Sequence, residues 1–322
     1  MAEMLSPGVF TTEIDASTIA PSVSNSIAVY CGAFDVGPTG TYSLITTVDE
    51  LISTYGPVTD TNYQDWYQCY NFLQYGNKLY VARAVGESAL CAQAEDGAGV
   101  DLTGEETPVG NLEAFENEQF NPVGSDSTVR FIARNPGEWG NKLEIAIARP
   151  EEFGDTANTE LFKGVFANEL FEYVPDADAK EVGIVVSFDG KVQEIFTVST
   201  DKDARDAATG KSNYIEDVIN NQSSLIYVAH KFGTDITEPR VFKTGGVETP
   251  SSELPIRLDG GANSDLMADN IMGAITACYD YWDNKEAVDI DIVIGNERDQ
   301  GAGAFKLCNT RKDCIGFIGA EK

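Results

Sequence analysis

The sequence predicts a mixed α/β protein of the α+β class, with a strand-rich middle domain and short flanking helices. Three observations predict this fold class. Nine short apolar runs have the composition of β-strands, whereas five segments show helical spacing of their apolar residues. An Asp-Gly pair separates two of the apolar runs, which is typical of a β-hairpin turn. The length of 322 residues is sufficient for about two domains, each with its own hydrophobic core.

The predicted strands follow one another along most of the chain. Asp189-Gly190 predicts the turn of an antiparallel hairpin, and Asn135-Pro136-Gly137 predicts a turn between two other strands. In chain order, the predicted strands are Ser26–Phe34, Lys78–Val85, Thr128–Arg134, Lys142–Ala148, Val182–Phe188, Val192–Ser199, Ser224–His230, Ala287–Ile294 and Cys314–Ile318.

The strongest helical pattern covers Ser264–Trp282. Its apolar residues recur at helical spacing, and Ser264 or Asn263 is the expected N-cap. We interpret its aromatic end as hydrophobic core rather than as part of a ligand site. The other predicted helices are Val48–Tyr55, Tyr63–Tyr75, Asn213–Asn220 and Phe305–Thr310.

The chain is strongly acidic, with 22 Lys and Arg against 52 Asp and Glu, a net charge of −30. Such a surface repels nucleic acid and anionic lipid, so we expect neither as a partner and expect a protein instead. The N-terminus has the features of neither a signal peptide nor a membrane span. Copies of this chain should repel one another at low ionic strength, so self-assembly should improve with salt.

The six cysteines predict buried, reduced thiols in a cytoplasmic protein. They contain no C-x-x-C pair, so the sequence predicts neither a zinc site nor a redox motif. The cysteines are Cys31, Cys69, Cys91, Cys278, Cys308 and Cys314.

An acidic segment interrupts the apolar pattern between Arg83 and Arg130. It contains ten acidic residues and no Lys or Arg. We interpret this span as a solvated insertion between two apolar segments, which is either a flexible acidic loop or a small protruding module.

Residues 1–22 form a different kind of segment. A turn is followed by alternating apolar and polar residues, and this pattern predicts an extended arm that adds a strand to the sheet of a neighbouring molecule. A frayed terminus explains the same pattern. The candidate contact residues of the arm are Leu5, Pro7, Gly8, Val9, Phe10 and Ile14.

Residues that could support catalysis or bind a metal are scarce. His230 is the single histidine, and we assign it a structural role at a strand end because no G-x-S-x-G motif is present. Asp201, Asp203 and Asp206 lack the spacing of an EF-hand, and Asp289 and Asp291 fit the polar face of a strand. We predict no catalytic residue, no metal and no cofactor.

The glycines of the Gly295–Gly303 segment suggest one alternative. The segment follows a predicted strand and precedes a helix, which is the setting of a phosphate-binding loop. Its spacing matches neither dinucleotide nor P-loop motifs, so a nucleotide-binding enzyme is the weaker hypothesis.

Basic residues gather at the end of the chain. From Arg298 to Lys322 there are five basic and three acidic residues. An acidic body with a mildly basic end can pair head to tail with copies of itself, although a solvated face has the same composition. The candidate contact residues are Arg298, Lys306, Arg311 and Lys312.

Several short motifs, in order along the chain, resemble contractile tail sheath proteins of myovirus bacteriophages. The most specific is Asn71-Phe72-Leu73-Gln74-Tyr75-Gly76-Asn77-Lys78-Leu79-Tyr80-Val81-Ala82-Arg83-Ala84. The others are Leu5-Ser6-Pro7-Gly8-Val9, Phe34-Asp35-Val36-Gly37-Pro38, Val48-Asp49-Glu50-Leu51, Pro136-Gly137-Glu138-Trp139-Gly140-Asn141-Lys142-Leu143 and Leu258-Asp259-Gly260-Gly261. A weaker resemblance extends to sheaths of related contractile injection systems.

The resemblance implies a structural function rather than an enzymatic one. Sheath subunits stack as hexameric rings around a tail tube and contract to drive the tube through the host envelope. The implied partners are other copies of the chain, the tail tube protein, and the baseplate and tail terminator proteins. The implied location is the virion, after assembly in the host cytoplasm. A generic acidic binding module is the remaining alternative.

The resemblance also implies a division of the chain. Residues 1–22 correspond to a linking arm, 23–88 with 128–260 to a middle domain, 89–127 to an outward protrusion, and 264–322 to the start of an inner, tube-facing α/β domain. By the same resemblance, the candidate tube-facing residues of the basic end are Arg298, Lys306, Arg311 and Lys312. Sheath proteins usually continue beyond the equivalent of Lys322. The resemblance therefore implies a truncated or divergent short form.

Overall fold

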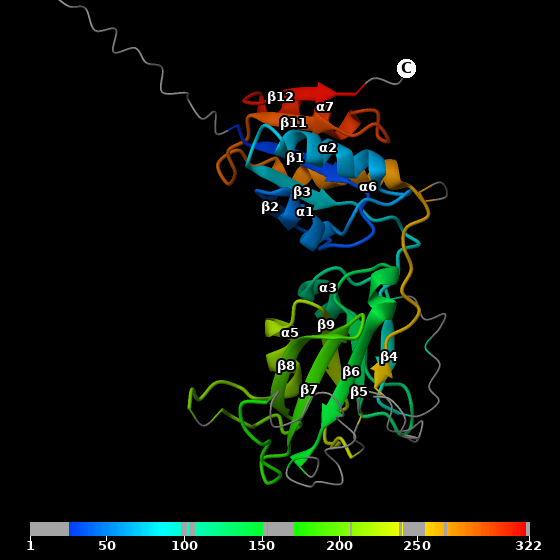
Figure 1. The fold of residues 1–322 in the computed structure, drawn as a ribbon, viewed down its shortest axis with the longest axis vertical. Helices are drawn as coiled ribbons and strands as arrows, with labels where there is room; N and C mark the ends of the chain where they lie inside the picture. Colours follow the sequence, from blue (N-terminus) through cyan, green and yellow to red (C-terminus); the bar gives the residue numbers. More distant parts are fainter. Residues whose placement is uncertain are drawn as a thin grey trace, which may run out of the picture.

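A computed structural model describes residues 26–97, 102, 107–150, 153, 171–206, 208–237, 240, 255–266 and 269–319. Helices and strands are mixed throughout, which confirms the predicted fold class. The strands form three sheets, one with five strands, one with four and one with three. Figure 1 shows the five-stranded sheet with its helices at one end of the molecule and the two other sheets at the opposite end.

The five-stranded sheet combines the first and the last described parts of the chain. Its order is β12-β11-β1-β3-β2, and β2 alone is antiparallel to its neighbour. The strands are β1 (Ala28–Gly32), β2 (Tyr42–Ile45), β3 (Leu79–Arg83), β11 (Ile292–Gly295) and β12 (Ile315–Ile318).

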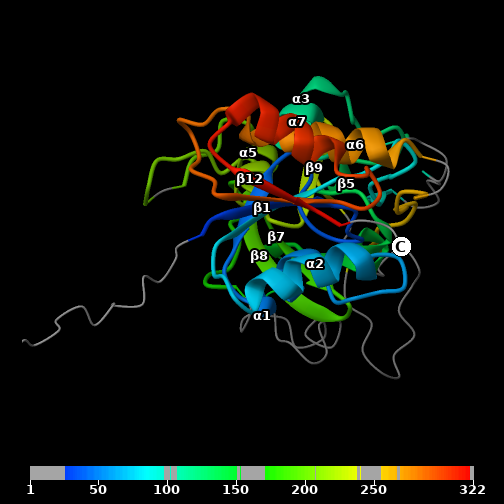
Figure 2. The ribbon, with the colours of Figure 1, turned by 90° about the horizontal axis from the view of Figure 1, so that it is seen from above.

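Helices cover both faces of this sheet. α1 (Val48–Tyr55) and α2 (Tyr63–Leu73) pack on one face, and α6 (Ile271–Cys278) and α7 (Ala302–Arg311) pack on the other (Figure 2). Successive side chains of a strand point to opposite faces, so β1 contributes to two cores. Ala28 and Tyr30 lie in the core beneath α1 and α2, whereas Val29 and Cys31 lie in the core beneath α6 and α7.

The other two sheets are antiparallel and share one core. The four-stranded sheet has the order β10-β6-β7-β8, and the three-stranded sheet has the order β4-β5-β9. Their strands are β4 (Gln93–Glu95), β5 (Val129–Ala133), β6 (Leu143–Ala148), β7 (Glu181–Phe188), β8 (Lys191–Ser199), β9 (Ile226–His230) and β10 (Ile256–Arg257). Helices α3 (Leu112–Asn117) and α5 (Ile215–Gln222) contribute Phe115, Ile215 and Ile219 to the shared core.

The predicted hairpin between β7 and β8 is confirmed. Asp189 and Gly190 both have positive φ, 50° and 74°, as a two-residue turn of type I′ requires. The short strands β2, β4 and β10 were not predicted from the sequence. Each has only two to four residues, too few for an alternating pattern to stand out.

The predicted helix Ser264–Trp282 is wrong at its start. α6 begins at Ile271, with Asn270 as its N-cap, and a 3-10 turn covers Tyr279–Trp282. The residues before α6 bond to another loop instead. Ser264 Oγ accepts the Gly86 N–H at 2.7 Å, and the Asp269 carboxylate accepts the Ser88 hydroxyl at 2.6 Å.

The three sheets do not follow the predicted domains of the chain, whose boundaries lie after residue 88 and before residue 264. Residues 28–83 pair with 292–318 in one sheet, and not with the strands of 128–260. The acidic segment also contributes to the core, because β4 pairs with β5 and both Val109 and Phe115 are buried in the shared core. Apolar residues lie between the acidic residues of this segment, and they pack against the neighbouring sheet.

Two carboxylates of the acidic segment accept hydrogen bonds from backbone N–H groups and stabilise its position. The Glu95 carboxylate accepts the Val123 and Gly124 N–H groups at 2.8 and 3.0 Å, and the Asp96 carboxylate accepts the Thr128 and Val129 N–H groups at 2.6 and 2.9 Å.

Among the described residues, no helix has the length and apolar character needed to cross a membrane.

Candidate functional site

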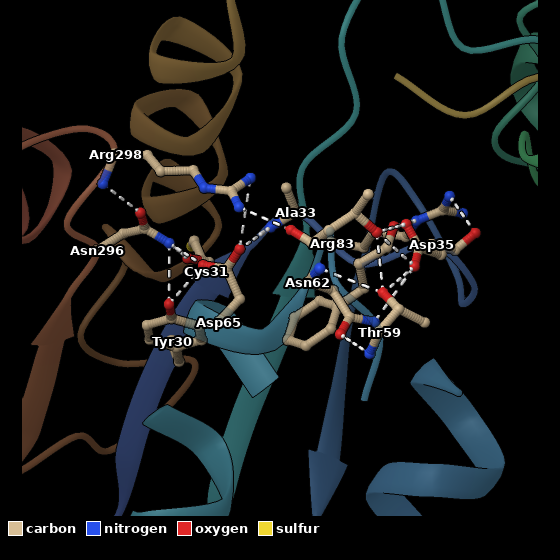
Figure 3. A network of polar contacts seen from close by, with 12 residues as sticks. Tyr30, Cys31, Ala33, Asp35, Thr59, Asn62, Asp65, Arg83, Asn296 and Arg298 are labelled. Atoms are coloured by element: carbon tan, nitrogen blue, oxygen red, sulfur yellow. Dashed lines mark hydrogen bonds and ion pairs between the residues drawn. The ribbon is translucent and has the colours of Figure 1, made fainter. Parts of the chain in front are cut away.

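The carboxyl ends of the parallel strands are the first place to look for a site in this fold. From β1 the chain reaches β3 through α1 and α2, whereas β11 continues to β12 through α7 on the opposite face. The connections diverge between β1 and β11, which is where open α/β sheets commonly bind ligands. A network of polar side chains from β1, α2 and the segment after β11 meets at this point (Figure 3).

Asp65 is the centre of this network. It lies on α2 and is 1% exposed. Its carboxylate accepts the Tyr30 hydroxyl at 2.6 Å and the Ala33 N–H at 3.2 Å, and it also accepts the Asn296 side-chain amide. Arg298 Nη1 lies 3.8 Å from Asp65 Oδ2. Burial raises the pKa of Asp65, and the hydrogen bond from Tyr30 and the charge of Arg298 oppose this shift.

Asn296 connects β11 to β1 through the same network. Its amide nitrogen donates to the Cys31 carbonyl at 3.0 Å and to the Tyr30 hydroxyl oxygen at 2.9 Å. Its amide oxygen accepts the Arg298 N–H at 2.7 Å. The bonds to Tyr30 and Cys31 join residues separated by more than 260 positions in the chain.

Arg83, at the end of β3, organises the neighbouring loop. Its guanidinium is buried and donates to three carbonyls, those of Phe34 at 2.7 Å, Asp35 at 2.9 Å and Gly37 at 2.9 Å. Burial lowers the pKa of Arg83 to about 10, with the Asp35 charge opposing the shift. The Asp35 carboxylate in turn accepts the Thr59 hydroxyl at 2.6 Å.

The arrangement supports the structure rather than chemistry on a bound molecule. Asp65, Arg83 and Asn296 are each at most 2% exposed, and their polar atoms bond to one another or to the backbone. The crevice that holds a ligand in other α/β sheets is therefore filled by the protein's own side chains. This network was not predicted from the sequence. Its one visible signal is Asp65, the only charged residue between Thr61 and Asn77.

In the Gly295–Gly303 segment, a side chain of the segment itself bonds to the backbone N–H groups that a ligand would need. Asp299 accepts the Gly301 and Gly303 N–H groups at 2.9 and 3.0 Å, where α7 begins. A carboxylate thus takes the position at the helix N-terminus that a phosphate takes in nucleotide-binding loops. This geometry opposes the nucleotide-binding alternative.

The four basic residues predicted at the end of the chain are not brought together as one patch. Arg311 is 4% exposed and donates to the carbonyls of Trp282 and Val288 at 2.7 and 2.8 Å. Arg298 is directed toward Asp65, and Lys306 forms an exposed ion pair with Asp280. Lys312 is exposed at the end of α7. The predicted arm residues Leu5, Pro7, Gly8, Val9, Phe10 and Ile14 lie outside the described residues.

His230 lies at the end of a strand and bonds within the fold. It is 4% exposed at the end of β9, its Nδ1 lies 3.1 Å from the Tyr214 hydroxyl, and its Nε2 lies 3.1 Å from the Thr234 carbonyl. Asp201 and Asp206 bond to nearby backbone N–H groups. In the part of the chain that the structure describes, no group of three or more His, Cys, Asp or Glu side chains could hold a metal ion.

Two of the exposed surfaces on the five-stranded sheet and its helices carry several apolar or aromatic side chains each. The edge strand β12 exposes Ile315, Phe317 and Ile318, by 66%, 59% and 48%. The outer side of α2 and the residues after it expose Tyr63, Tyr67 and Tyr75. We call these surfaces the β12 edge and the α2 tyrosine face.

The polar network is bonded within the fold, and the β12 edge and the α2 tyrosine face are exposed. No protein-family model matches the chain. Over 142 residues it is 28% identical to the tail sheath protein of Enterobacteria phage T4, a match that covers 44% of this chain and 20% of the relative. The predicted resemblance to a phage tail sheath protein is confirmed over this stretch.

Two solved structures are also similar. The sheath tail protein of Listeria innocua is 12% identical, with a TM-score of 0.45, and the match covers 91% of this chain and 47% of that one. The sheath tail protein of Desulfitobacterium hafniense is 13% identical, with a TM-score of 0.43, and the match covers 95% and 50%. The chain thus spans a fifth of the curated relative and about half of each solved chain.

Proposed function

We propose that this chain is a non-enzymatic structural subunit of a phage contractile tail sheath. In this proposal, copies stack as hexameric rings around a tail tube, and contraction of the stack drives the tube through the host envelope during genome delivery. The observation that carries the proposal is the 28% identity to the T4 tail sheath protein over 142 residues. The sheath of a related contractile injection system is the alternative within the same class.

The proposal includes partners and a location. The subunit contacts copies of itself, the tail tube protein, and the baseplate and tail terminator proteins, and it contacts neither nucleic acid nor membrane. It is assembled in the host cytoplasm and resides in the virion. Residues 1–22 act as the linking arm, residues 89–127 face outward, and the part from residue 264 onward faces the tube.

The β12 edge supports the self-assembly part of the proposal. An edge strand presents unpaired backbone N–H and C=O groups, and a strand from another segment can bond to them. The exposed Ile315 and Phe317 side chains on this strand offer apolar area to such a segment. Proteins generally protect edges of this kind with charge or with a covering element.

The α2 tyrosine face supports contact with another copy of the same chain. The protein carries a net charge of −30, yet Asp65 is the only charged residue between Thr61 and Asn77, and it is buried. A neutral face allows a second acidic molecule to approach with little repulsion. Tyrosine is also among the residues enriched in protein interfaces. A basic partner would instead be attracted to the acidic remainder of the surface.

Electron microscopy of the purified chain at increasing ionic strength tests the proposal. We expect rings or tubes that form more readily as salt screens the negative charge. Tyr75→Glu places a charge on the α2 tyrosine face at a side chain that is 97% exposed, and it should weaken assembly. Val123→Glu, at a side chain that is 59% exposed in the other half of the molecule, is the matched control and should not.

Two other results would contradict the proposal. A chain that stays monomeric at all salt concentrations and is stabilised against heat by a nucleotide would favour the enzyme hypothesis. A monomer without nucleotide binding would favour the generic acidic binding module.

A further inference from the structure

The six cysteines separate into two groups in the structure. Four are buried at 7% exposure or less and lie in the two cores of the five-stranded sheet or beside β4. Cys308 and Cys314 are partly exposed, and all six thiols are free. The sequence predicts six buried thiols, and the partial exposure of Cys308 and Cys314 differs from that prediction.

Cys308 and Cys314 lie next to each other. Cys308 is on α7, Cys314 directly precedes β12, and their sulfur atoms are 3.8 Å apart, with the Cys314 S–H donating to Cys308. A disulfide joins sulfurs about 2 Å apart. Closing the pair therefore requires a movement of roughly 2 Å, which lies within the reach of side-chain rotation.

The turn that carries both thiols is held in position. Lys312 adopts the left-handed conformation, with φ of 62°, and its N–H donates to the Cys308 carbonyl at 2.9 Å. The Arg311 guanidinium donates to the Asp313 carboxylate at 3.0 Å and to the Trp282 carbonyl at 2.7 Å. A Cβ on Gly316 would lie 3.1 Å from Cys308 Sγ, so the glycine leaves space for the sulfur beside β12.

We propose that Cys308 and Cys314 form a dithiol site that small-molecule disulfides oxidise to an intrachain disulfide. The Cys308 thiolate attacks the reagent disulfide, forms a mixed disulfide and releases one reagent thiolate. The Cys314 sulfur loses its proton, attacks Cys308 Sγ and displaces the second reagent thiolate. Overall, two protein thiols and one reagent disulfide give one protein disulfide and two reagent thiols.

The surroundings assign the order of the two steps. Burial, together with the neighbouring Cys308, raises the pKa of Cys314 to about 12. Since the thiolate is the nucleophile, Cys308 makes the first attack and Cys314 resolves the mixed disulfide. The product links α7 to β12, the edge strand whose four residues are all exposed. The disulfide therefore anchors the least protected strand of the sheet.

Peptide mapping after treatment with oxidised glutathione tests the site. Trypsin cleaves after Lys306, Arg311 and Lys312, so the disulfide joins the peptides 307–311 and 313–322. We expect this joined pair in the folded protein, with a loss of the mass of two hydrogen atoms and its disappearance on reduction. Native protein should also show two reactive thiols out of six before oxidation and none afterwards.

Two variants complete the test. Cys308→Ser and Cys314→Ser should each abolish the joined peptides, and Cys308→Ser should also slow the first reaction with the reagent. Separate glutathione adducts at the two positions, or linkage between different molecules, would overturn the proposal. If a variant fails to fold, the peptide map of the unaltered chain still decides, because it requires no substitution.

Discussion

The five-stranded sheet and the β6–β7–β8 sheet are built in different ways. β6, β7 and β8 are consecutive along the chain, and the β7–β8 pair is closed by the local turn Asp189-Gly190. The five-stranded sheet instead pairs β1 with β11, more than 250 residues later. At that junction lies the buried network of Asp65, Asn296 and Arg298, with Arg83 close to it. Strands that are remote in sequence are thus held in register by buried polar contacts, whereas neighbouring strands rely on turns and apolar packing.

The largest effect is expected for Arg83. Arg83→Met leaves three buried carbonyls without their donor and should lower the free energy of unfolding by about 3–5 kcal/mol. Arg257→Met is the matched control, since that side chain is 70% exposed and pairs with Glu144, and it should change stability by less than about 0.5 kcal/mol. Urea denaturation measures both. Equal effects would mean that the junction does not depend on buried polar contacts.

Asp65→Asn should have a smaller effect that depends on pH. The folded-state pKa of Asp65 is raised above its ordinary value of 3.8, so its contribution to stability is complete below that value and is lost as pH rises through the folded-state pKa. We expect Asp65→Asn to lower stability by about 1–3 kcal/mol near pH 4, and by less at pH 7.

Denaturation at several pH values compares Asp65→Asn with the unaltered chain. Tyr30→Phe is the control, because it removes a hydroxyl bonded to the carboxylate but keeps the carboxylate itself. The control should retain the pH dependence. A difference between Asp65→Asn and the unaltered chain that grows with pH would contradict the assigned direction.

His230 provides a test in the other half of the molecule. Burial lowers its pKa from the ordinary value of 6.5, so its contribution to stability is present above pH 6.5 and is lost as pH falls toward the folded-state pKa. Between pH 7 and 5 the protein should therefore lose part of its stability through this residue. His230→Gln should remove that loss, and thermal melting at both pH values measures it. An unchanged loss in the variant would show that other groups cause it.

The smallest effect is expected for the exposed ion pair of Lys306 and Asp280. Its nitrogen–oxygen distances are 2.5 and 2.7 Å, but both side chains are more than 40% exposed. Water screens such a pair, so Lys306→Met should leave the melting temperature unchanged within error. A clear decrease in the melting temperature would show that this surface ion pair stabilises α7.

Much of the fold could be predicted from the sequence because the relevant signals are local. The β7–β8 hairpin follows from Asp189-Gly190, and α7 and β12 match their predicted segments closely. The start of α6 could not be predicted, because Ser264 and Asp269 bond to a loop about 180 residues earlier. The sequence likewise predicts a flexible loop or a small protruding module for the acidic segment, whereas Phe115 packs in a core formed with later strands.

The candidate surfaces also combine features that are visible in the sequence with features that only the structure shows. The sequence reveals the neutral, tyrosine-rich composition of residues 61–77, and the structure adds that Tyr67 and Tyr75 are exposed while Asp65 is buried. The basic residues near the end of the chain seemed to form one surface. In the structure Arg311 is buried and bonded to backbone carbonyls, because the position of a side chain depends on elements far away in sequence.

The sequence by itself therefore determined the fold class, the acidic character and the resemblance to tail sheath proteins, because composition, turns and motifs are properties of contiguous residues. The tertiary structure alone decided which strands share a sheet, that Asp65 and Asn296 meet, and that Cys308 lies beside Cys314. The physical reason is that burial and pairing depend on contacts between segments that only the folded chain brings together.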